Sequence, residues 1–451
     1  MTKEIKKKCY YRIGFTLKSP LAIGSGGNTN TDKDIIRNSF GHPYIPASAI
    51  AGVCSHAVKE ENIYPQQEIY KYLGFVRIKG NETEEDDSTK DLKDAMESRV
   101  IFYDGQMMNG KDTYFVSARD SVALDEYKTA KRGAKFDMEV LEPGIRFVTY
   151  LEQDYYDGDT LDFAAQLARL FLAGKISFGG KNTRGYGEIK DVQVGWRQFI
   201  LAEHDTDGDG FEEWLNFDLY DENGWKEWTE APITTERKLT LRLKQVGGIS
   251  IRRYTTRIRD NEQESQPDFE QMTVHHGAEE LPVIPGTSWA GAFRHRMREL
   301  GLQHAAEEKL FGFVRGEGQD EKARSRIRFS ETIIQEKDGK GKPREKILSR
   351  NAIDRFSGGT VDGALFTEKT YYGGMTDLEI TLQGKEALTE QECRILVMSI
   401  ADLHYGFLAV GGETSIGRGL FSILQVNGKD IVDGDTVYEQ LWQEIKGVMS
   451  E

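Results

Sequence analysis

Residues 178–189 read FGGKNTRGYGEI, and residues 410–421 read VGGETSIGRGLF. The two stretches share four glycines at the same spacing, and each follows a segment with the apolar periodicity of a helix. Glycine tolerates positive φ and lets another backbone approach closely, so each stretch predicts a tight loop. The return of the same loop in the second half of the chain predicts a duplicated unit.

The second half of the chain repeats the first in order, well beyond the glycine loops. The matched pairs are RIGFTLK (12–18) with KLTLRLK (238–244), HPYIPASAIAG (42–52) with LPVIPGTSWAG (281–291), LGFVR (73–77) with FGFVR (311–315), SRVIFYD (98–104) with SRIRFSE (325–331), VALDEY (122–127) with NAIDRF (351–356), and GAKFDMEVLEPG (133–144) with GALFTEKTYYGG (363–374). One match could arise by chance, but an ordered series in register indicates two copies of one domain.

Each copy has a β-α-β-β-α-β pattern, with alternating strands and a helix after the Ile-Pro turn. A later helix is predicted over 162–174 in the first copy and over 390–406 in the second, where Thr389 and Glu392 have capping-box spacing. Four strands with two helices on one face give the ferredoxin-like (RRM-like) α+β fold. We expect a first domain over 1–195, an acidic linker over 196–235, and a second domain over 236–451 that ends in an amphipathic helix.

The composition fits a cytoplasmic protein of two or three domains. The chain has 451 residues, of which 38% are hydrophobic, and we see neither a membrane-spanning run nor a signal peptide. Its three cysteines, Cys9, Cys54 and Cys393, are too scattered for a disulfide framework or a zinc site. The net charge of −15 comes from two acidic stretches, 82–97 and 203–230, so the remaining surface can still hold basic strips.

The second acidic stretch contains DTDGDGFEEWLN (205–216), which begins like a calcium-binding EF-hand loop. Its twelfth position is Asn216, where such a loop needs a bidentate glutamate. We therefore interpret this stretch as part of the acidic linker.

The Ile-Pro turn, the NAIDRF…GALF block and the GG-x4-GxG loop together resemble the RAMP superfamily of CRISPR effector proteins, over roughly 10–195 and 236–425. The chain is most similar to a tandem fusion of two type III backbone subunits, of the III-D kind. The resemblance implies CRISPR RNA, target RNA, other backbone subunits and the large effector subunit as partners. It also implies an inserted thumb hairpin in each copy; Phe136, Leu365 and Phe366 are candidate apolar tips, with core packing as the alternative.

Glycine-rich loops can present backbone amides to phosphate oxygens, and nearby cations add to the attraction. Neither loop is a Walker A motif. The resemblance implies that the loops and the helix after each Ile-Pro turn follow the guide backbone. The candidate RNA-binding residues are Arg37, Ser48, Gly179, Gly180, Lys181, Arg184, Gly185, Gly187, Thr287, Ser288, Arg294, Gly411, Gly412, Gly417, Arg418 and Gly419. Because Glu413 and Ile416 replace Lys181 and Arg184, we expect weaker binding by the second loop.

The resemblance also implies cleavage of target RNA by an aspartate before the Ile-Pro turn. Asp32 and Asp268 are the candidates, because each lies nine residues before a glycine, and Asp34 competes with Asp32. The aspartate would act as a base for the 2′-hydroxyl or hold Mg²⁺ or another divalent cation, with Asp32 as the possible ligand. The alternative is that both are solvated loop residues. The neighbouring pair His275 and His276 is interpreted as an exposed turn.

Three functions remain open on the sequence alone. The first is an endoribonuclease subunit that binds guide RNA and cuts target RNA within a complex. The second is a non-catalytic backbone subunit. The third is a stand-alone ribonuclease that processes CRISPR transcripts, for which His56 or His295 would be the base.

Overall fold

The computed structural model describes residues 4–27, 31–76, 95–108, 114–124, 130–201, 210–228, 237–253, 267–276, 279–314, 322–336, 341–384, 386–432, 434 and 436–449. The chain divides into two compact units. Unit 1 is Met1–Val116, Pro143–Gly180 and Gly187–Glu236, and unit 2 is Ser117–Glu142, Lys181–Tyr186 and Arg237–Glu451. Two segments of the first sequence copy therefore belong to unit 2.

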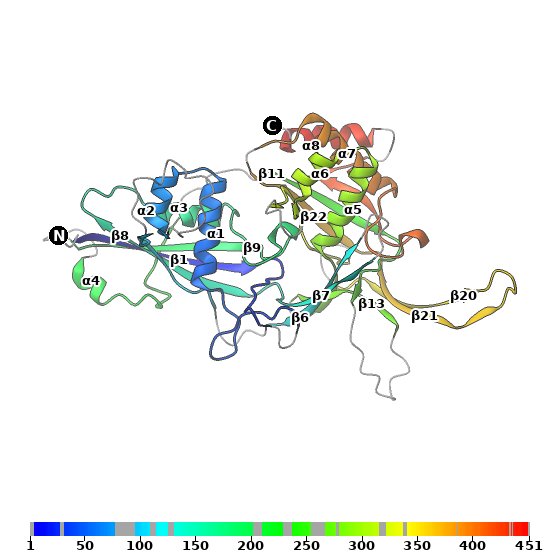
Figure 1. Ribbon diagram of the computed structural model, residues 1–451, viewed down its shortest axis with the longest axis horizontal. Coiled ribbons are helices and arrows are strands. Elements are labelled where there is room, and N and C mark those ends of the chain that lie inside the picture. The colour runs from blue at the N-terminus through cyan, green and yellow to red at the C-terminus, as the bar shows by residue number, and fades with distance from the viewer. Residues whose placement is uncertain are drawn as a thin grey trace. The chain divides into compact units, whose positions relative to one another are not determined.

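Unit 1 is built on an antiparallel sheet with β1 (Ile5–Leu17) at its centre. The strand order is β10 (Lys226–Glu227), β9 (Ile189–Ile200), β1, β8 (Arg146–Tyr156), β4 (Val100–Phe102), and β5 (Gln106–Met107) also pairs with β8. Helices α1 (Ala47–Glu60), α2 (Gln66–Leu73) and α3 (Phe163–Leu172) lie on one face of the sheet (Figure 1). The strands β2 (Phe75–Val76) and β3 (Ala95–Met96) form a separate small ribbon. The order β9-β1-β8-β4 is that of a ferredoxin-like domain.

The sheet of unit 1 is also packed against the segment that follows β9. Trp214, on the short helix α4 (Phe211–Leu215), donates a hydrogen bond of 2.9 Å from Nε1 to the hydroxyl of Tyr10. The ring of Phe217 lies 5.2 Å from that of Tyr10 and 5.0 Å from that of Phe199. Residues 210–228 are therefore a folded part of unit 1, which corrects the expectation of an acidic linker there. Its aromatic residues supply the apolar contacts that a solvated linker lacks. The aspartates at 205–209 lie outside the described residues.

Unit 2 repeats the same architecture around β11 (Arg237–Val246). The strand order is β18 (Ile327–Phe329), β22 (Met375–Leu382), β11, β23 (Leu420–Val426), β24 (Lys429–Asp430). Among its described residues, the unit also contains four helices: α5 (Gly286–Glu299), α6 (His304–Phe311), α7 (Glu390–Tyr405) and α8 (Val437–Met449). The predicted pair of ferredoxin-like α+β domains is confirmed.

Local signals in the sequence explain the ends of α7 and the position of α8. The Thr389 hydroxyl accepts from the amide of Glu392, while the Glu392 carboxylate accepts from the amide of Thr389 at 2.8 Å, so the predicted capping box forms. Helix α8 buries one stripe of side chains in the core of unit 2: Val437, Leu441, Ile445 and Met449. The C-terminal helix is thus part of this domain.

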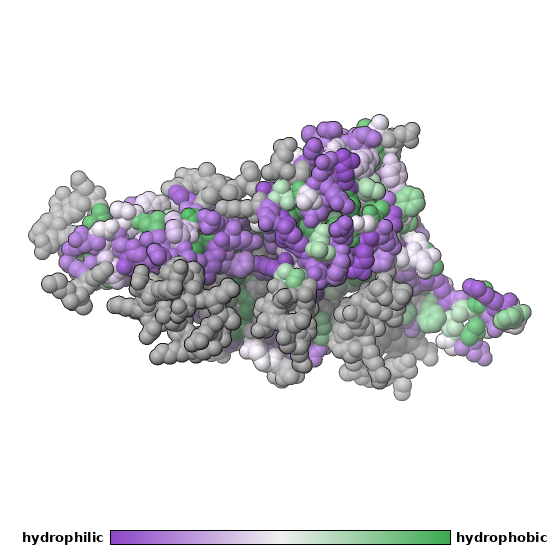
Figure 2. All heavy atoms as spheres, turned by 45° about the horizontal axis from the view of Figure 1, so that its top comes forward, coloured by the Kyte–Doolittle hydropathy of each residue, from purple (hydrophilic) through white to green (hydrophobic). Residues whose placement is uncertain are grey.

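Two long hairpins are inserted in unit 2. One is β6 (Val116–Leu124) with β7 (Ala130–Leu141), and the other is β20 (Arg344–Ile353) with β21 (Thr360–Tyr372), which projects away from the helices (Figure 1). Near the turn of the second hairpin, Phe356 and Leu365 are exposed, and hydrophobic surface is visible along it (Figure 2). The predicted thumb hairpins are confirmed, with Leu365 and Phe366 exposed and Phe136 half-buried.

Short strands complete unit 2. They are β12 (Arg252–Arg253), β13 (Phe269–Gln271), β14 (Thr273–His276), β15 (Glu279–Ile284), β16 (Phe313–Val314), β17 (Lys322–Ala323) and β19 (Thr332–Ile333). Strands β12 and β13 join the base of the β20–β21 hairpin in one four-stranded sheet.

Candidate nucleic-acid interface

The two glycine loops have nearly the same backbone. Each contains one 3₁₀ turn, η2 (Asn182–Arg184) or η3 (Thr414–Ile416), flanked on both sides by left-handed residues. The residue before the turn is not glycine in either copy: Lys181 has a φ of 58° and Glu413 a φ of 56°. A non-glycine residue is uncommon in this region, so its recurrence shows that the two loops are structurally equivalent.

The amides of these loops bond to the protein itself. Gly180 donates to the carbonyl of Ala22 at 2.8 Å, and Gly412 donates to that of Ser250 at 2.7 Å. Within each turn, further amides donate to loop carbonyls, such as Gly185 to Asn182 at 3.1 Å. The amides of Gly180, Gly185 and Gly412 therefore already have protein acceptors and cannot also serve a phosphate nest without losing them.

The glycine spacing that the two loops share reflects close packing. A Cβ added to Gly187 would collide with the carbonyl oxygen of Phe178, and one added to Gly419 would collide with that of Val410. Both glycines also have positive φ, so no other residue fits without strain. Any contact with RNA at the loops therefore depends on their side chains.

The first-copy loop lies against the start of α5 inside unit 2. A Cβ added to Gly286, the first residue of α5, would lie 2.5 Å from the carbonyl oxygen of Arg184. Thr287 and Ser288 follow at once on the helix and are half-buried. The structure thus brings the exposed Arg184 together with two predicted hydroxyl residues at a helix N-terminus, where the dipole favours an anion.

Lys181 belongs to the same surface. Its ammonium group lies 4.3 Å from the centroid of the Phe136 ring and 5.9 Å from that of Tyr186. A cation over an aromatic face is held in place without losing its charge. Phe136 therefore positions Lys181 beside the loop rather than forming a hairpin tip.

A buried ion cluster that the sequence did not reveal supports the β6–β7 hairpin. Arg119 on β6 is 2% exposed and forms ion pairs with Glu142, at 2.8 Å, and with Glu331. Burial opposes ionisation, but the two carboxylates outweigh it and raise the pKa of Arg119. Glu331 aligns with Asp104 in the sequence repeat. The repeat therefore predicts an acidic residue at this position, but it does not predict the pairing with Arg119.

At the corresponding helix of unit 1, Asp104 occupies the N-terminus. Its Oδ1 accepts a 2.7 Å hydrogen bond from the amide of Ala47, the first residue of α1. Ser48 is exposed beside it, and Arg37 is exposed on the turn before the helix. A phosphate at the N-terminus of α1 would therefore lie beside the negative Asp104 carboxylate, which already accepts from the Ala47 amide.

Two predicted cations are already paired within unit 2. Arg418 is 8% exposed and lies 2.9 Å from the Glu368 carboxylate, with the Tyr372 hydroxyl as a second partner. Arg294 pairs with the buried Glu307, which also binds Arg298. Each of the two arginines therefore neutralises a buried glutamate, but the Arg294 side chain stays 38% exposed whereas that of Arg418 is only 10% exposed.

The Glu307 carboxylate shows how strong this pairing is. Burial would raise its pKa, but hydrogen bonds and charge from Arg298 and Arg294 lower the pKa to about 2. Both arginines of α5 are therefore structural partners of one acid on α6.

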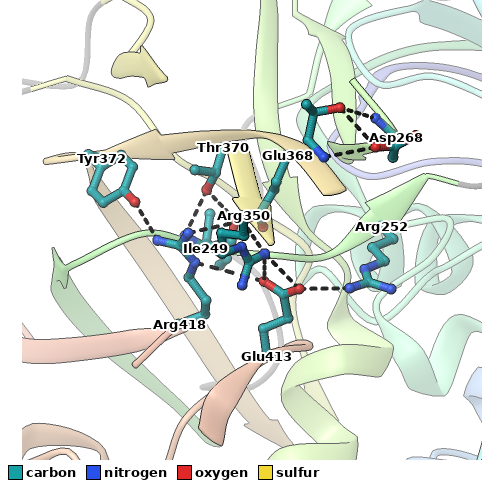
Figure 3. Close-up of polar contacts among 10 residues, drawn as sticks. Ile249, Arg252, Asp268, Arg350, Glu368, Thr370, Tyr372, Glu413 and Arg418 are labelled. Carbon is teal, nitrogen blue, oxygen red and sulfur yellow. Dashed lines mark hydrogen bonds and ion pairs between the residues drawn. The ribbon is translucent and has the colours of Figure 1, made fainter. Parts of the chain in front are cut away.

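Glu413 is the centre of a second ion network at the base of the β20–β21 hairpin (Figure 3). Its carboxylate accepts from Arg252 at 2.8 Å and from Arg350 at 2.7 Å. Burial raises the pKa of Glu413, and the two guanidinium groups more than reverse this, so the net shift is downward. The sequence shows that Glu413 replaces Lys181, but it does not show that Glu413 pairs with Arg252 and Arg350, which lie far from it in the chain.

The two candidate catalytic aspartates occupy equivalent positions. The amide of Ile36 donates to the carbonyl of Ile23 at 2.9 Å, and the amide of Met272 donates to that of Ile251 at 2.7 Å. Each aspartate thus lies four residues before an amide that donates to the segment after the first strand of its domain, as the predicted alignment requires. Both side chains are exposed.

The surroundings of the two aspartates differ. Asp268 Oδ2 accepts from the amide of Thr367 at 2.8 Å and from its hydroxyl at 3.0 Å, which ties the carboxylate to β21 (Figure 3). Asp34, the competitor of Asp32, is buried, and its Oδ1 accepts from the amide and hydroxyl of Thr31. Asp32 is thus exposed where its competitor Asp34 is buried, and Asp268 is exposed but held by Thr367.

A metal centre made of protein ligands alone does not form in the described part of the chain, where no three His, Cys, Asp or Glu side chains are grouped for one. Mg²⁺ at Asp32 would have to complete its shell with water and RNA oxygens, which is common for this cation. The candidate general bases His56 and His295 each lie beside a glutamate one turn along their helix, at 3.3 and 3.2 Å.

Comparison with known proteins agrees with the duplication. The model of the RAMP superfamily matches the chain twice, over residues 15–190 and 247–422. No curated protein matches the sequence. Among the described residues, no helix is both long and apolar enough to cross a membrane. The chain belongs to the RAMP superfamily of CRISPR-associated RNA-binding proteins and carries two of its domains in tandem.

Proposed function

We propose that this protein is a double backbone subunit of a type III CRISPR effector, in which each domain holds a stretch of the guide RNA. The family match over both copies carries this proposal. The surface formed by Lys181, Arg184, Thr287 and Ser288 supports it, because cations and hydroxyls beside a helix N-terminus suit phosphate oxygens. Such contacts position a strand without reading its bases. The other backbone subunits and the large effector subunit would be its protein partners.

Cleavage of the target RNA is the second part of the proposal. The 2′-hydroxyl oxygen attacks the adjacent phosphorus, the bond to the 5′-oxygen breaks, and that oxygen takes a proton from water, so the products are a 2′,3′-cyclic phosphate and a 5′-hydroxyl. Asp32 would accept the proton of the 2′-hydroxyl or hold Mg²⁺, whose charge would offset that of the phosphate. Asp268 would contribute less, because its carboxylate already accepts two hydrogen bonds from Thr367.

The test replaces the aspartates one at a time, Asp32→Asn and Asp268→Asn, in the reconstituted effector with Mg²⁺. We expect D32N to lower the cleavage rate at its position by about 10²-fold or more, the usual contribution of acid–base catalysis, with target binding unchanged. D268N should have the smaller effect. Undiminished cleavage by the double variant would exclude the catalytic role and leave a non-catalytic backbone subunit.

That non-catalytic function is the main alternative, and one observation favours it. In the described part of the chain, neither aspartate belongs to a group of three or more His, Cys, Asp or Glu side chains that could hold a metal ion. A stand-alone transcript-processing nuclease is a further alternative. It would cut a repeat RNA without other subunits, so incubating the purified chain with such an RNA separates it from both.

A further inference from the structure

The ion network at Glu413 has more positive than negative members. Three arginines, Arg252, Arg350 and Arg418, surround two glutamates, Glu368 and Glu413. The side chains of Arg252 and Arg350 are 30% and 34% exposed, whereas that of Glu368 is 3% exposed and that of Glu413 17%. Positive charge therefore faces solvent, and the acids lie beneath it.

The arginines are held in place from below. Arg252 lies over the ring of Phe269, 3.8 Å from its centroid, and Arg350 reaches the buried Glu368 at 3.1 Å as well as Glu413. A guanidinium group has five N–H donors, so an arginine that pairs with a carboxylate and stays about one-third exposed can also donate to a phosphate oxygen.

The equivalent position in the first copy carries the opposite charge. Lys181 and Glu413 occupy the same left-handed backbone position in the two loops. Lys181 adds a positive charge to its loop, whereas Glu413 neutralises two arginines, Arg252 and Arg350. A carboxylate that bridges two guanidinium groups occupies the place that a phosphodiester would take. The two copies thus differ in how much charge is available to RNA.

We propose that Arg252 and Arg350 form a binding site for one RNA phosphodiester and that Glu413 is its internal counterion, which the phosphate must displace. This inference rests on the proposed RNA-binding function. On this inference, Glu413 is the residue that makes the second domain bind RNA more weakly than the first.

The experiment measures binding of a fluorescein-labelled oligouridylate to the full chain by anisotropy, across a series of salt concentrations. Glu413→Gln keeps the shape of the side chain and removes its charge. We expect binding about three- to tenfold tighter at low salt, and a plot of log K against log salt steeper by about 0.7 for the added phosphate contact. Glu439→Gln, on the exposed face of α8, changes net charge equally and should leave both quantities unchanged.

A second variant, E413Q/R252Q, separates the anion site from a merely structural network. Loss of the E413Q gain in this variant supports the site. The inference fails if E413Q lowers the thermal midpoint without tightening binding, if E439Q gives the same gain, or if the gain survives R252Q. If the wild-type chain and E413Q both fail to bind the RNA, the proposed function itself fails; if the wild type binds and E413Q changes nothing, only this inference does.

Discussion

At the scale of single residues, several charged side chains of unit 2 form buried ion pairs. Glu307, with a side chain 1% exposed, holds two arginines, and the fully buried Arg119 holds two glutamates. A buried ion pair that loses one member leaves an uncompensated charge, which is strongly destabilising. These pairs fix the positions of α5 and of the β6–β7 hairpin.

Replacing Glu307 by Gln should therefore lower the free energy of unfolding of this unit by about 3 kcal/mol at neutral pH. The pKa of Glu307 is about 2 in the folded protein, against 4.5 for a free glutamate carboxyl. Its stabilisation is fully present above pH 4.5 and is lost as pH falls towards 2. Urea unfolding at several pH values measures this, and E307Q should flatten the acid side of the wild-type profile. An unchanged profile would mean that Glu307 is not paired.

Which charges are accessible could not be predicted from the sequence. Arg184 and Arg418 both sit in a glycine loop, yet one is exposed and the other lies against Glu368. Glu368 lies on β21, fifty residues before Arg418, so only tertiary packing brings the two together. The alignment of Asp32 with Asp268, in contrast, rests on a local signal, the spacing of each to a later glycine.

At the scale of elements, the two glycine loops are packing devices that recur because both domains need them. Each lets a strand, a turn and the segment after the first strand approach within hydrogen-bonding distance. The loop positions and both later helices were predictable, since glycine spacing, helical periodicity and the Thr389 capping box are all local signals. The folded state of 210–228 was not, since its acidic composition masked the aromatic contacts to Tyr10 and Tyr150.

Two glycine-to-alanine changes in unit 2 test this packing role. Gly419→Ala would drive a Cβ into the Val410 carbonyl, whereas Gly291→Ala, in α5, would meet open space. We expect G419A to lower the unfolding free energy by more than about 1 kcal/mol and G291A to raise it by about 0.5–1 kcal/mol. Thermal denaturation of both variants checks the signs. Equal effects would show that the loop is not tightly packed.

At the scale of the whole molecule, the sequence duplication predicts the fold of the two domains but not the boundaries of the two compact units. The sequence divides near residue 236, and a division at Glu236–Arg237 is also seen in the structure, but the first copy's hairpin and η2 loop belong to unit 2. Unit 2 thus combines the cations of one copy with the helix N-terminus of the other. Repeat analysis treats each copy as self-contained, so it could not show this exchange.

The salt dependence of RNA binding by the full chain tests the central claim most directly. The variant K181Q/R184Q removes the two cations beside α5, and K429Q/R394Q removes two exposed cations elsewhere in unit 2. We predict that the wild type binds an oligouridylate and that K181Q/R184Q reduces the slope of log K against log salt by about 1.4, two phosphate contacts, while the control does not. A wild type that does not bind, or equal losses in the two variants, would contradict the account.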